Sequence, residues 1–226
     1  RMNFAVIVFP GSNCDHDAYH IFKSVLNTSV DFVWHKETDL KKYDAILIPG
    51  GFSYGDHLRT GAIASFSPVM DAIIKEANSG KPVFGICNGF QILIESGLLP
   101  GALIINKNIR FLSQHVTIEV ASANSIYTRS MQKGQQLTMP IAHKQGNFIA
   151  DKETLNRLQG EDRIAFKYIK DDKMNSNPNG SMSSIAGILN KKRNVLGMMP
   201  HPERASESLL GSEDGLEIFK SITGVV

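Results

Sequence analysis

The chain has 226 residues, of which 42% are hydrophobic and 20% are charged, a balance that excludes a disordered, collagen-like or coiled-coil protein. Its 24 Lys and Arg residues nearly balance its 22 Asp and Glu residues, and no basic stripe favours nucleic acid binding. No apolar run approaches the roughly 18 residues of a membrane span. We therefore expect a single domain over residues 1–226 that contacts neither nucleic acid nor membrane.

Cysteine usage favours a reducing compartment. The two cysteines, Cys14 and Cys87, are too few for a disulfide scaffold. The apolar run at 4–9 is shorter than the core of a signal peptide and stops at a Pro-Gly turn. We therefore expect a cytoplasmic protein in which either thiol could be a nucleophile.

Strand and helix signals alternate through the first half of the chain. Apolar runs of strand length end at Pro or Gly turns, and the stretches between them have helical spacing or helix start signals. We expect strands at 3–9, 30–35, 45–48 and 82–86, and helices at about 12–26, 67–80 and 89–96. Strands joined by helices form crossover units, so this half predicts a mostly parallel central sheet with helices on both faces.

The second half changes character. Shorter strand-like runs separated by turns predict antiparallel additions to the sheet, at 115–121, 137–142, 163–169 and 184–189. A last apolar strand is expected at 195–199 and a closing helix at 215–222. The stretch 175–184 is rich in Asn, Ser and Gly and is expected to be a flexible surface loop.

Cys87 lies at a predicted strand–turn–helix junction, with Gly85 two residues before it and Gly89 two residues after it. This is the arrangement of a nucleophile elbow, in which side chains at the flanking positions would collide with nearby backbone. The helix N-terminus would also favour a thiolate at the sulfur. The alternative is a buried structural cysteine, and the two glycines favour the nucleophile. Cys14 lacks such glycines and is interpreted as mainly structural, lining the carboxyl edge of the sheet, because neighbouring acidic residues disfavour a thiolate.

A nucleophilic cysteine needs a base and a group that orients the base. His201 follows the last apolar strand, and an extended segment after it would place Glu203 on the same side as His201. The carboxylate could then hold the imidazole tautomer, although a surface His–Glu pair would have the same sequence. The backbone N–H of Asn88 and the turn at Pro49–Gly51 could stabilise an oxyanion.

Together these residues resemble the class I (triad) glutamine amidotransferases. The pattern of that family is an elbow G-x-C-x-G-x-Q, an upstream Pro-Gly-Gly turn and a late His-Pro-Glu, which stand here at 85–91, 49–51 and 201–203. The resemblance implies the flavodoxin-like fold of the family, the nucleophile Cys87, the base His201 and the orienting residue Glu203. It also implies oxyanion donors at Gly51 and Asn88 and a glutamine pocket that contains Gly50, Gln91, His143, Gly146 and Phe148.

Further stretches narrow the resemblance within the family. Asn88 and Phe90 in the elbow are similar to the small glutaminase subunits of a purine-biosynthesis synthase, as are the stretches 9–18, 50–64, 106–111 and 198–204. The chain departs from the pattern at 141–146, where it reads IAHKQG and the family often reads IAHGEG. Lys144 and Gln145 therefore change part of the implied glutamine pocket.

The resemblance implies a γ-glutamyl thioester on Cys87 and a partner that receives ammonia. Because the chain has no phosphate-loop motif and no zinc spacing, no metal or cofactor is expected here, and ATP and Mg are expected on a large synthetase subunit joined by a small bridging subunit. The loop at 52–61, with Tyr54, Asp56 and Arg59, is expected to sense this partner, unless it is only a solvated loop. Two rival functions stay open: a γ-glutamyl hydrolase that acts alone and a non-catalytic binding module.

Overall fold

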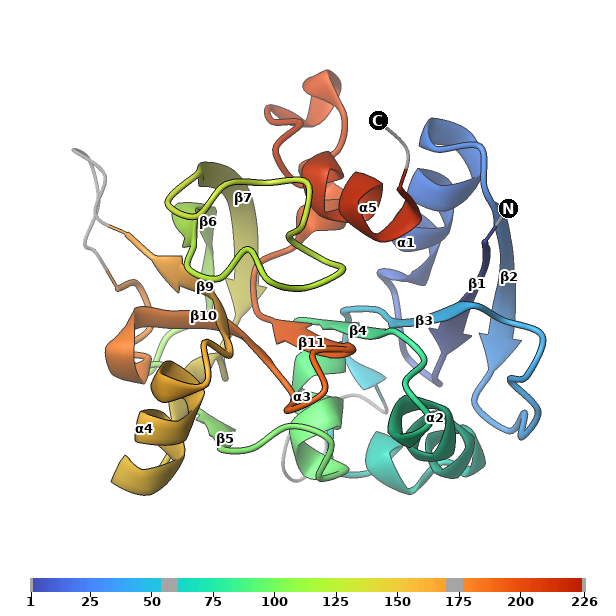
Figure 1. The fold of residues 1–226 in the computed structure, drawn as a ribbon, viewed down its shortest axis with the longest axis horizontal. Helices are drawn as coiled ribbons and strands as arrows, with labels where there is room; N and C mark the ends of the chain where they lie inside the picture. The colour runs from blue at the N-terminus through green and yellow to red at the C-terminus, as the bar shows by residue number, and fades with distance from the viewer. Residues whose placement is uncertain (1, 54–60, 170–176, 225–226) are drawn as a thin grey trace.

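A nine-stranded sheet forms the centre of the computed structural model, which describes residues 2–53, 61–169 and 177–224 (Figure 1). The strands that pair in parallel are β1 (Asn3–Val8), β2 (Ser29–Trp34), β3 (Ala45–Ile48), β4 (Val83–Ile86) and β11 (Val195–Met198). The strands with antiparallel partners only are β6 (Leu112–Val120), β7 (Gln136–His143), β9 (Ile164–Tyr168) and β10 (Ile185–Leu189). The spatial order is β2-β1-β3-β4-β11-β10-β9-β6-β7.

The sheet confirms the expected fold class: four parallel strands from the first half are joined by β11 from the second half, and the other second-half strands are antiparallel additions. Helices α1 (Asp15–His20) and α5 (Leu216–Thr223) lie on one face, and α2 (Pro68–Asn78) and α3 (Asn88–Glu95) lie on the other (Figure 1). Because both faces are covered, β3 and β4 are buried along their whole length, as expected of continuous apolar runs. In the part of the chain that is described, no helix has the length and apolar character needed to cross a membrane.

Several smaller elements were not expected from the sequence. A separate two-stranded sheet pairs β5 (Ala102–Ile104) with β8 (Asn147–Ile149), and α4 (Lys152–Gly160) follows it. The side chain of Asp151 caps α4 by accepting a hydrogen bond of 2.7 Å from the backbone N–H of Thr154. Short 3-10 turns are η3 (Ala64–Phe66), η4 (Met182–Ser184), η5 (Pro202–Arg204) and η6 (Ser208–Leu210).

The first helix differs from its expected range of 12–26. It begins at Asp15, with Cys14 as its N-cap, and becomes the π-helical turn η1 (Ile21–Val25). The wider turn is visible at its end, where the N–H of Leu26 donates to the carbonyl oxygen of Ile21 at 2.9 Å. Cys14 therefore stands before the helix rather than inside its first turn.

The expectation of a flexible surface loop at 175–184 is wrong for Asn179 and Ser181, which are almost fully buried, whereas Met182 and Ser183 lie at the surface as expected. The side chains of Asn179 and Ser181 both donate to the carbonyl oxygen of Gly146, Asn179 at 2.8 Å and Ser181 at 3.2 Å. The polar composition thus serves a buried hydrogen-bond network, because buried polar groups need partners. This network holds the segment between β7 and β8 in place.

The parallel strands bring three distant segments to one edge of the sheet. The turn at Pro49–Gly51 follows β3, Cys87 follows β4, and His201 comes shortly after β11. These three strands are direct neighbours in the order β3-β4-β11, so their carboxyl ends meet. In open α/β sheets this edge is where ligands bind.

The junction between β4 and α3 leads to a test of the fold. A Cβ added at Gly89 would overlap the carbonyl oxygen of Ile48, whereas one added at Gly160 in α4 would meet no atom within 4 Å. Gly89→Ala should therefore lower the free energy of unfolding in urea by about 2 kcal/mol, the usual cost of overpacking. Gly160→Ala is the matched control and should leave stability unchanged or raise it by up to about 1 kcal/mol. Equal stability of the two variants would contradict the packing at Gly89.

Candidate active site

The backbone of Cys87 has a conformation that residues other than glycine rarely adopt, with φ 51° and ψ −105°. Two close approaches enforce it. A Cβ added at Gly85 would lie 2.7 Å from the carbonyl carbon of Gly89, and Gly89 itself touches β3. The N–H of Cys87 donates to the carbonyl oxygen of Met198 at 2.7 Å. The strained turn is thus locked between neighbouring strands and holds the sulfur at the N-terminus of α3.

His201 and Glu203 form a buried pair. Nδ1 of His201 lies 2.5 Å from Oε1 of Glu203, and each residue is only 2% exposed. The pair does not lie on the extended segment that we expected from Pro202. That expectation is wrong, because Pro202 takes the first position of the 3-10 turn η5, where its fixed φ is favourable. The turn still brings the carboxylate onto the imidazole.

The imidazole of His201 lies against the elbow. A Cβ added at Gly50 would be 2.7 Å from Cε1 of His201 and 3.4 Å from Cβ of Cys87, so Gly50 leaves room for both side chains. Although burial lowers the pKa of His201, Glu203 and then Cys87 raise it, with a net result of about 10. Nε2 of His201 is buried without a hydrogen-bond partner of good geometry among the described residues. The site therefore places a protonated imidazole beside the Cys87 thiol.

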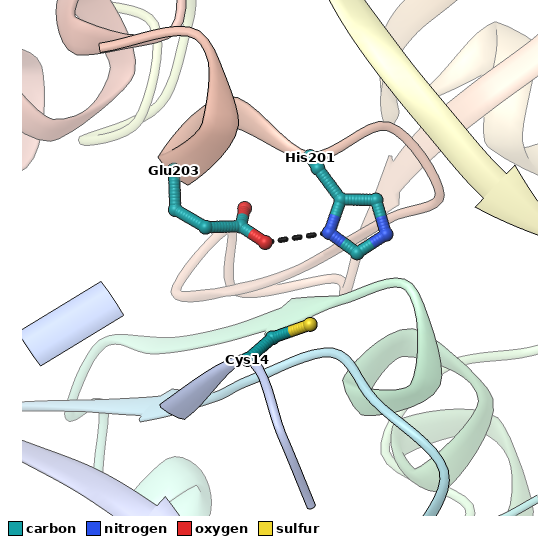
Figure 2. Close-up of side chains that lie close together, drawn as sticks. All are labelled: Cys14, His201 and Glu203. Atoms are coloured by element: carbon teal, nitrogen blue, oxygen red, sulfur yellow. Dashed lines mark hydrogen bonds and ion pairs between the residues drawn. The ribbon is translucent and has the colours of Figure 1, made fainter. Parts of the chain in front are cut away.

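Cys14 also reaches this cluster from the carboxyl edge of the sheet, where its sequence position had placed it, although its closeness to Glu203 was not anticipated. Figure 2 shows its sulfur beside the His201–Glu203 pair, and ligand atoms of the three residues lie within 4.8 Å of one another. Nη2 of Arg204 donates to this sulfur at 3.0 Å. Burial and then Glu203 raise the pKa of Cys14 to about 12, so its thiol stays protonated at neutral pH.

The Cys14 cluster is better suited to hydrogen bonding than to a metal ion. Nδ1 of His201 is already engaged by Glu203, and the guanidinium of Arg204 places a positive charge on the sulfur. A second cation at the same atoms would be repelled by that charge. Cys14, Glu203 and Arg204 thus form a packed, hydrogen-bonded support on one side of His201.

Two adjoining cavities meet at Cys87. The larger, of about 340 Å³, is lined by Gly51, Phe52, Cys87, Gln91, Phe111, Ala142, His143, Lys144 and Gln145. The smaller, of about 250 Å³, shares several of these residues and adds Asn13, Cys14, Ser113, His201 and Arg204. The Cys87 thiol points to the carbonyl oxygen of Ala142, which accepts from Sγ at 3.5 Å. A small substrate in either cavity would therefore reach the sulfur.

The five residues expected in a glutamine pocket occupy different places. Gln91 and His143 line the larger cavity, while Gly50 packs behind it against His201. Gly146 is outside the lining and touches the ring of His143, where no Cβ would fit. Phe148 is also outside it, fully buried and stacked on Phe90 at a centroid distance of 6.3 Å. Lys144 and Gln145, where the sequence departs from the family pattern, do line the cavity.

His143 is held in one neutral form. Oδ1 of Asn106 accepts from the backbone N–H of Gly146 at 3.1 Å and lies 3.1 Å from Nδ1 of His143. An oxygen that accepts from Gly146 also favours N–H at Nδ1, which leaves Nε2 as an acceptor. Burial and then His201 lower the pKa of His143 to about 3. The cavity wall therefore offers a buried, unpartnered Nε2 acceptor among the described residues.

The two expected oxyanion donors lie on the segments that flank Cys87. Gly51 has φ 122°, and a Cβ there would lie 2.6 Å from Oδ1 of Asn13. Asn88 is the first residue of α3 and is 1% exposed. Tyr54, Asp56 and Arg59, expected in a partner-sensing loop, lie outside the described residues.

Comparison with known proteins agrees with this architecture. The profile of the CobB/CobQ-like glutamine amidotransferase domain matches residues 1–215. A chain in the structure of PurLQS from Thermotoga maritima is 42% identical, with 99% of each chain covered and a TM-score of 0.89. A glutamine amidotransferase from Thermotoga maritima is 16% identical, with 98% of this chain and 96% of that chain covered and a TM-score of 0.62. The glutaminase domain of Trypanosoma brucei CTPS is 14% identical, with 99% of this chain and 94% of that chain covered and a TM-score of 0.62. At these low identities, the last two structures show the fold alone.

The His201–Glu203 pair predicts an unusual histidine titration. In ¹⁵N-imidazole NMR spectra, His201 should stay protonated from neutral pH up to about pH 10, while His143 should stay neutral above about pH 3. Glu203→Gln removes the negative charge that raises the pKa of His201, so its titration should move to lower pH. A wild-type His201 that titrates at its ordinary value of 6.5 would contradict the pairing.

Proposed function

Because the chain belongs to the CobB/CobQ-like glutamine amidotransferase family, we propose that it is the glutaminase subunit of phosphoribosylformylglycinamidine synthase in purine biosynthesis. Full-length similarity to a chain of PurLQS at 42% identity supports this assignment, since PurQ is the glutaminase subunit of that synthase. The observation that carries the chemistry is the strained Cys87 beside the buried His201–Glu203 pair. The subunit hydrolyses glutamine to glutamate and passes ammonia to an ATP-dependent synthetase subunit.

In the first step, the Cys87 thiolate attacks the side-chain amide carbon of glutamine. The backbone N–H groups of Gly51 and Asn88 stabilise the negative charge that develops on the amide oxygen. Each such donor is typically worth about 3–4 kcal/mol of transition-state stabilisation. Collapse of the tetrahedral intermediate breaks the C–N bond and leaves a γ-glutamyl thioester on Cys87.

His201 handles the protons of both steps. Its raised pKa of about 10 supplies an imidazolium that protonates the leaving ammonia. The neutral imidazole then takes a proton from the water that hydrolyses the thioester, and Cys87 leaves as the thiolate beside the reprotonated ring. Glu203, at 2.5 Å, orients the ring and stabilises its positive charge.

The larger cavity holds the glutamine. Gln91 and the neutral acceptor Nε2 of His143 provide hydrogen-bonding groups on its wall, with Lys144 and Gln145 beside them. Gly50 and Gly146 act behind this wall by packing against Cys87 and His143, and Phe148 is placed in the core behind it. A cavity of about 340 Å³ is the size expected for a small-molecule site.

Released ammonia would become unreactive ammonium in bulk water, so a partner must receive it. We assign that role to a large synthetase subunit that binds ATP and Mg, joined by a small bridging subunit. Both cysteines are free thiols, which suits a protein that works in the reducing cytoplasm. The loop at 52–61 is assigned to sensing the partner.

The two cysteines should react differently with an electrophilic glutamine analogue. Cys87 lines both cavities, whereas burial keeps the pKa of Cys14 at about 12. Peptide mass spectrometry after limited exposure should therefore find the label on Cys87 and an unmodified Cys14. Excess glutamine should protect Cys87. Preferential labelling of Cys14 would contradict the assigned nucleophile.

Partner dependence separates this function from its rivals. Ammonia release from glutamine should be low for the isolated chain and rise by more than about tenfold in the reconstituted synthase, because partner binding completes the site. Cys87→Ala should abolish glutamine-dependent synthesis and preserve synthesis from added ammonium. Full activity of the isolated chain would favour a γ-glutamyl hydrolase, and full glutamine-dependent synthesis by Cys87→Ala would favour a non-catalytic module.

A further inference from the structure

The side chain of Asn88 has no part in the mechanism above, which uses only its backbone N–H. It is nevertheless buried and hydrogen-bonded on both sides. Oδ1 of Asn88 accepts from the backbone N–H of Ser53 at 3.3 Å and also from the Ser53 hydroxyl. Nδ2 of Asn88 donates to Oε1 of Gln91 at 3.0 Å. The amide thus links the segment after Gly51 to the wall of the larger cavity.

The chain of hydrogen bonds continues through Gln91. Nε2 of Gln91 donates to the backbone carbonyl oxygen of Gln145 at 2.6 Å. Gln91 and Gln145 both line the larger cavity, whereas Ser53 does not. One path of side-chain hydrogen bonds therefore runs from the oxyanion segment after β3, across the first turn of α3, to the segment after β7.

The backbone groups at the two ends fix the direction of this chain. The N–H of Ser53 can only donate, so Asn88 must turn its oxygen toward Ser53 and its NH₂ toward Gln91. The carbonyl of Gln145 can only accept, so Gln91 must turn its NH₂ toward Gln145. Rotating either amide by 180° would place like atoms against each other in a buried site, which costs free energy.

We propose that the Asn88 side chain is a positioning residue for glutamine recognition, because it orients the Gln91 amide and ties that orientation to the position of Ser53. This proposal rests on the proposed function. It means that the affinity of the pocket for glutamine depends on the segment that carries the oxyanion donor Gly51. A residue outside the pocket, Ser53, then acts on substrate binding through Asn88.

Two substitutions test the proposal in the reconstituted synthase, with glutamine as the nitrogen source. Asn88→Asp keeps the shape and the acceptor toward Ser53 but cannot donate to Gln91. It should raise the KM for glutamine about tenfold, as expected for loss of one buried hydrogen bond. Ser53→Ala removes the hydroxyl donor from a residue outside the pocket and should raise the KM about threefold or more while changing kcat by less than about threefold.

The double variant gives the sharper readout. Because both substitutions break one chain, its KM should not exceed that of the weaker-binding single variant by more than about twofold. Ser96→Ala is the matched control, since Ser96 sits just after α3 and its hydroxyl donates to the carbonyl oxygen of Leu93 at 3.0 Å, away from this chain of hydrogen bonds. It should leave the KM unchanged.

Synthesis from added ammonium separates this proposal from the proposed function. Ammonium-dependent synthesis should be normal in all these variants, because it bypasses the glutamine pocket. An unchanged KM in Asn88→Asp, or single effects that multiply fully in the double variant, would overturn the role of Asn88, and an unchanged KM in Ser53→Ala would overturn its link to Ser53. Failure of the proposed function would instead appear as glutamine-dependent synthesis by Cys87→Ala. If Asn88→Asp does not fold, Asn88→Ala, which removes the donor to Gln91 without adding a charge, takes its place with the same expected rise in KM.

Discussion

The backbone conformation of Cys87 is the constraint on which the rest of the site depends. A φ of 51° at a residue with a side chain persists only when the surroundings leave no alternative. Gly85 and Gly89 allow α3 to pack directly onto β4 and β3, and this close packing leaves no room for a relaxed turn. Because β4 lies between β3 and β11, the same turn places the sulfur between the Pro49–Gly51 turn and the His201 segment.

Electrostatics then separates two chemically identical thiols. Cys14 and Cys87 both adjoin the His201–Glu203 cluster and both are buried. Burial and the nearby Glu203 raise the pKa of Cys14, and Arg204 donates a hydrogen bond to its sulfur. Cys87 instead borders both cavities and contributes to the raised pKa of His201. The histidines divide in a similar way, since Glu203 keeps His201 protonated while burial keeps His143 neutral.

Sequence reasoning succeeded where a local steric or apolar pattern determines structure. The strand at 45–48 has the expected bounds because four apolar residues fit a strand buried on both faces. It failed where distant partners decide: Asn179 and Ser181 look like loop residues until Gly146 supplies their hydrogen-bond acceptor. The same limit applies to Cys14, whose closeness to Glu203 arises only when β1 and β11 share a sheet edge. The roles assigned to Gly51, Asn88 and the glutamine pocket remain proposals built on this geometry.

The most direct test of the central claim is to trap the covalent intermediate. The reconstituted synthase is mixed with glutamine, quenched in acid during turnover, digested and examined by peptide mass spectrometry. A nucleophilic Cys87 predicts a γ-glutamyl group on the peptide that contains Cys87, sensitive to hydroxylamine and missing from a Cys87→Ser sample. The peptide that contains Cys14 should carry none. Steady glutamine turnover with no adduct on Cys87, combined with undiminished ammonia release by Cys87→Ser, would contradict the claim.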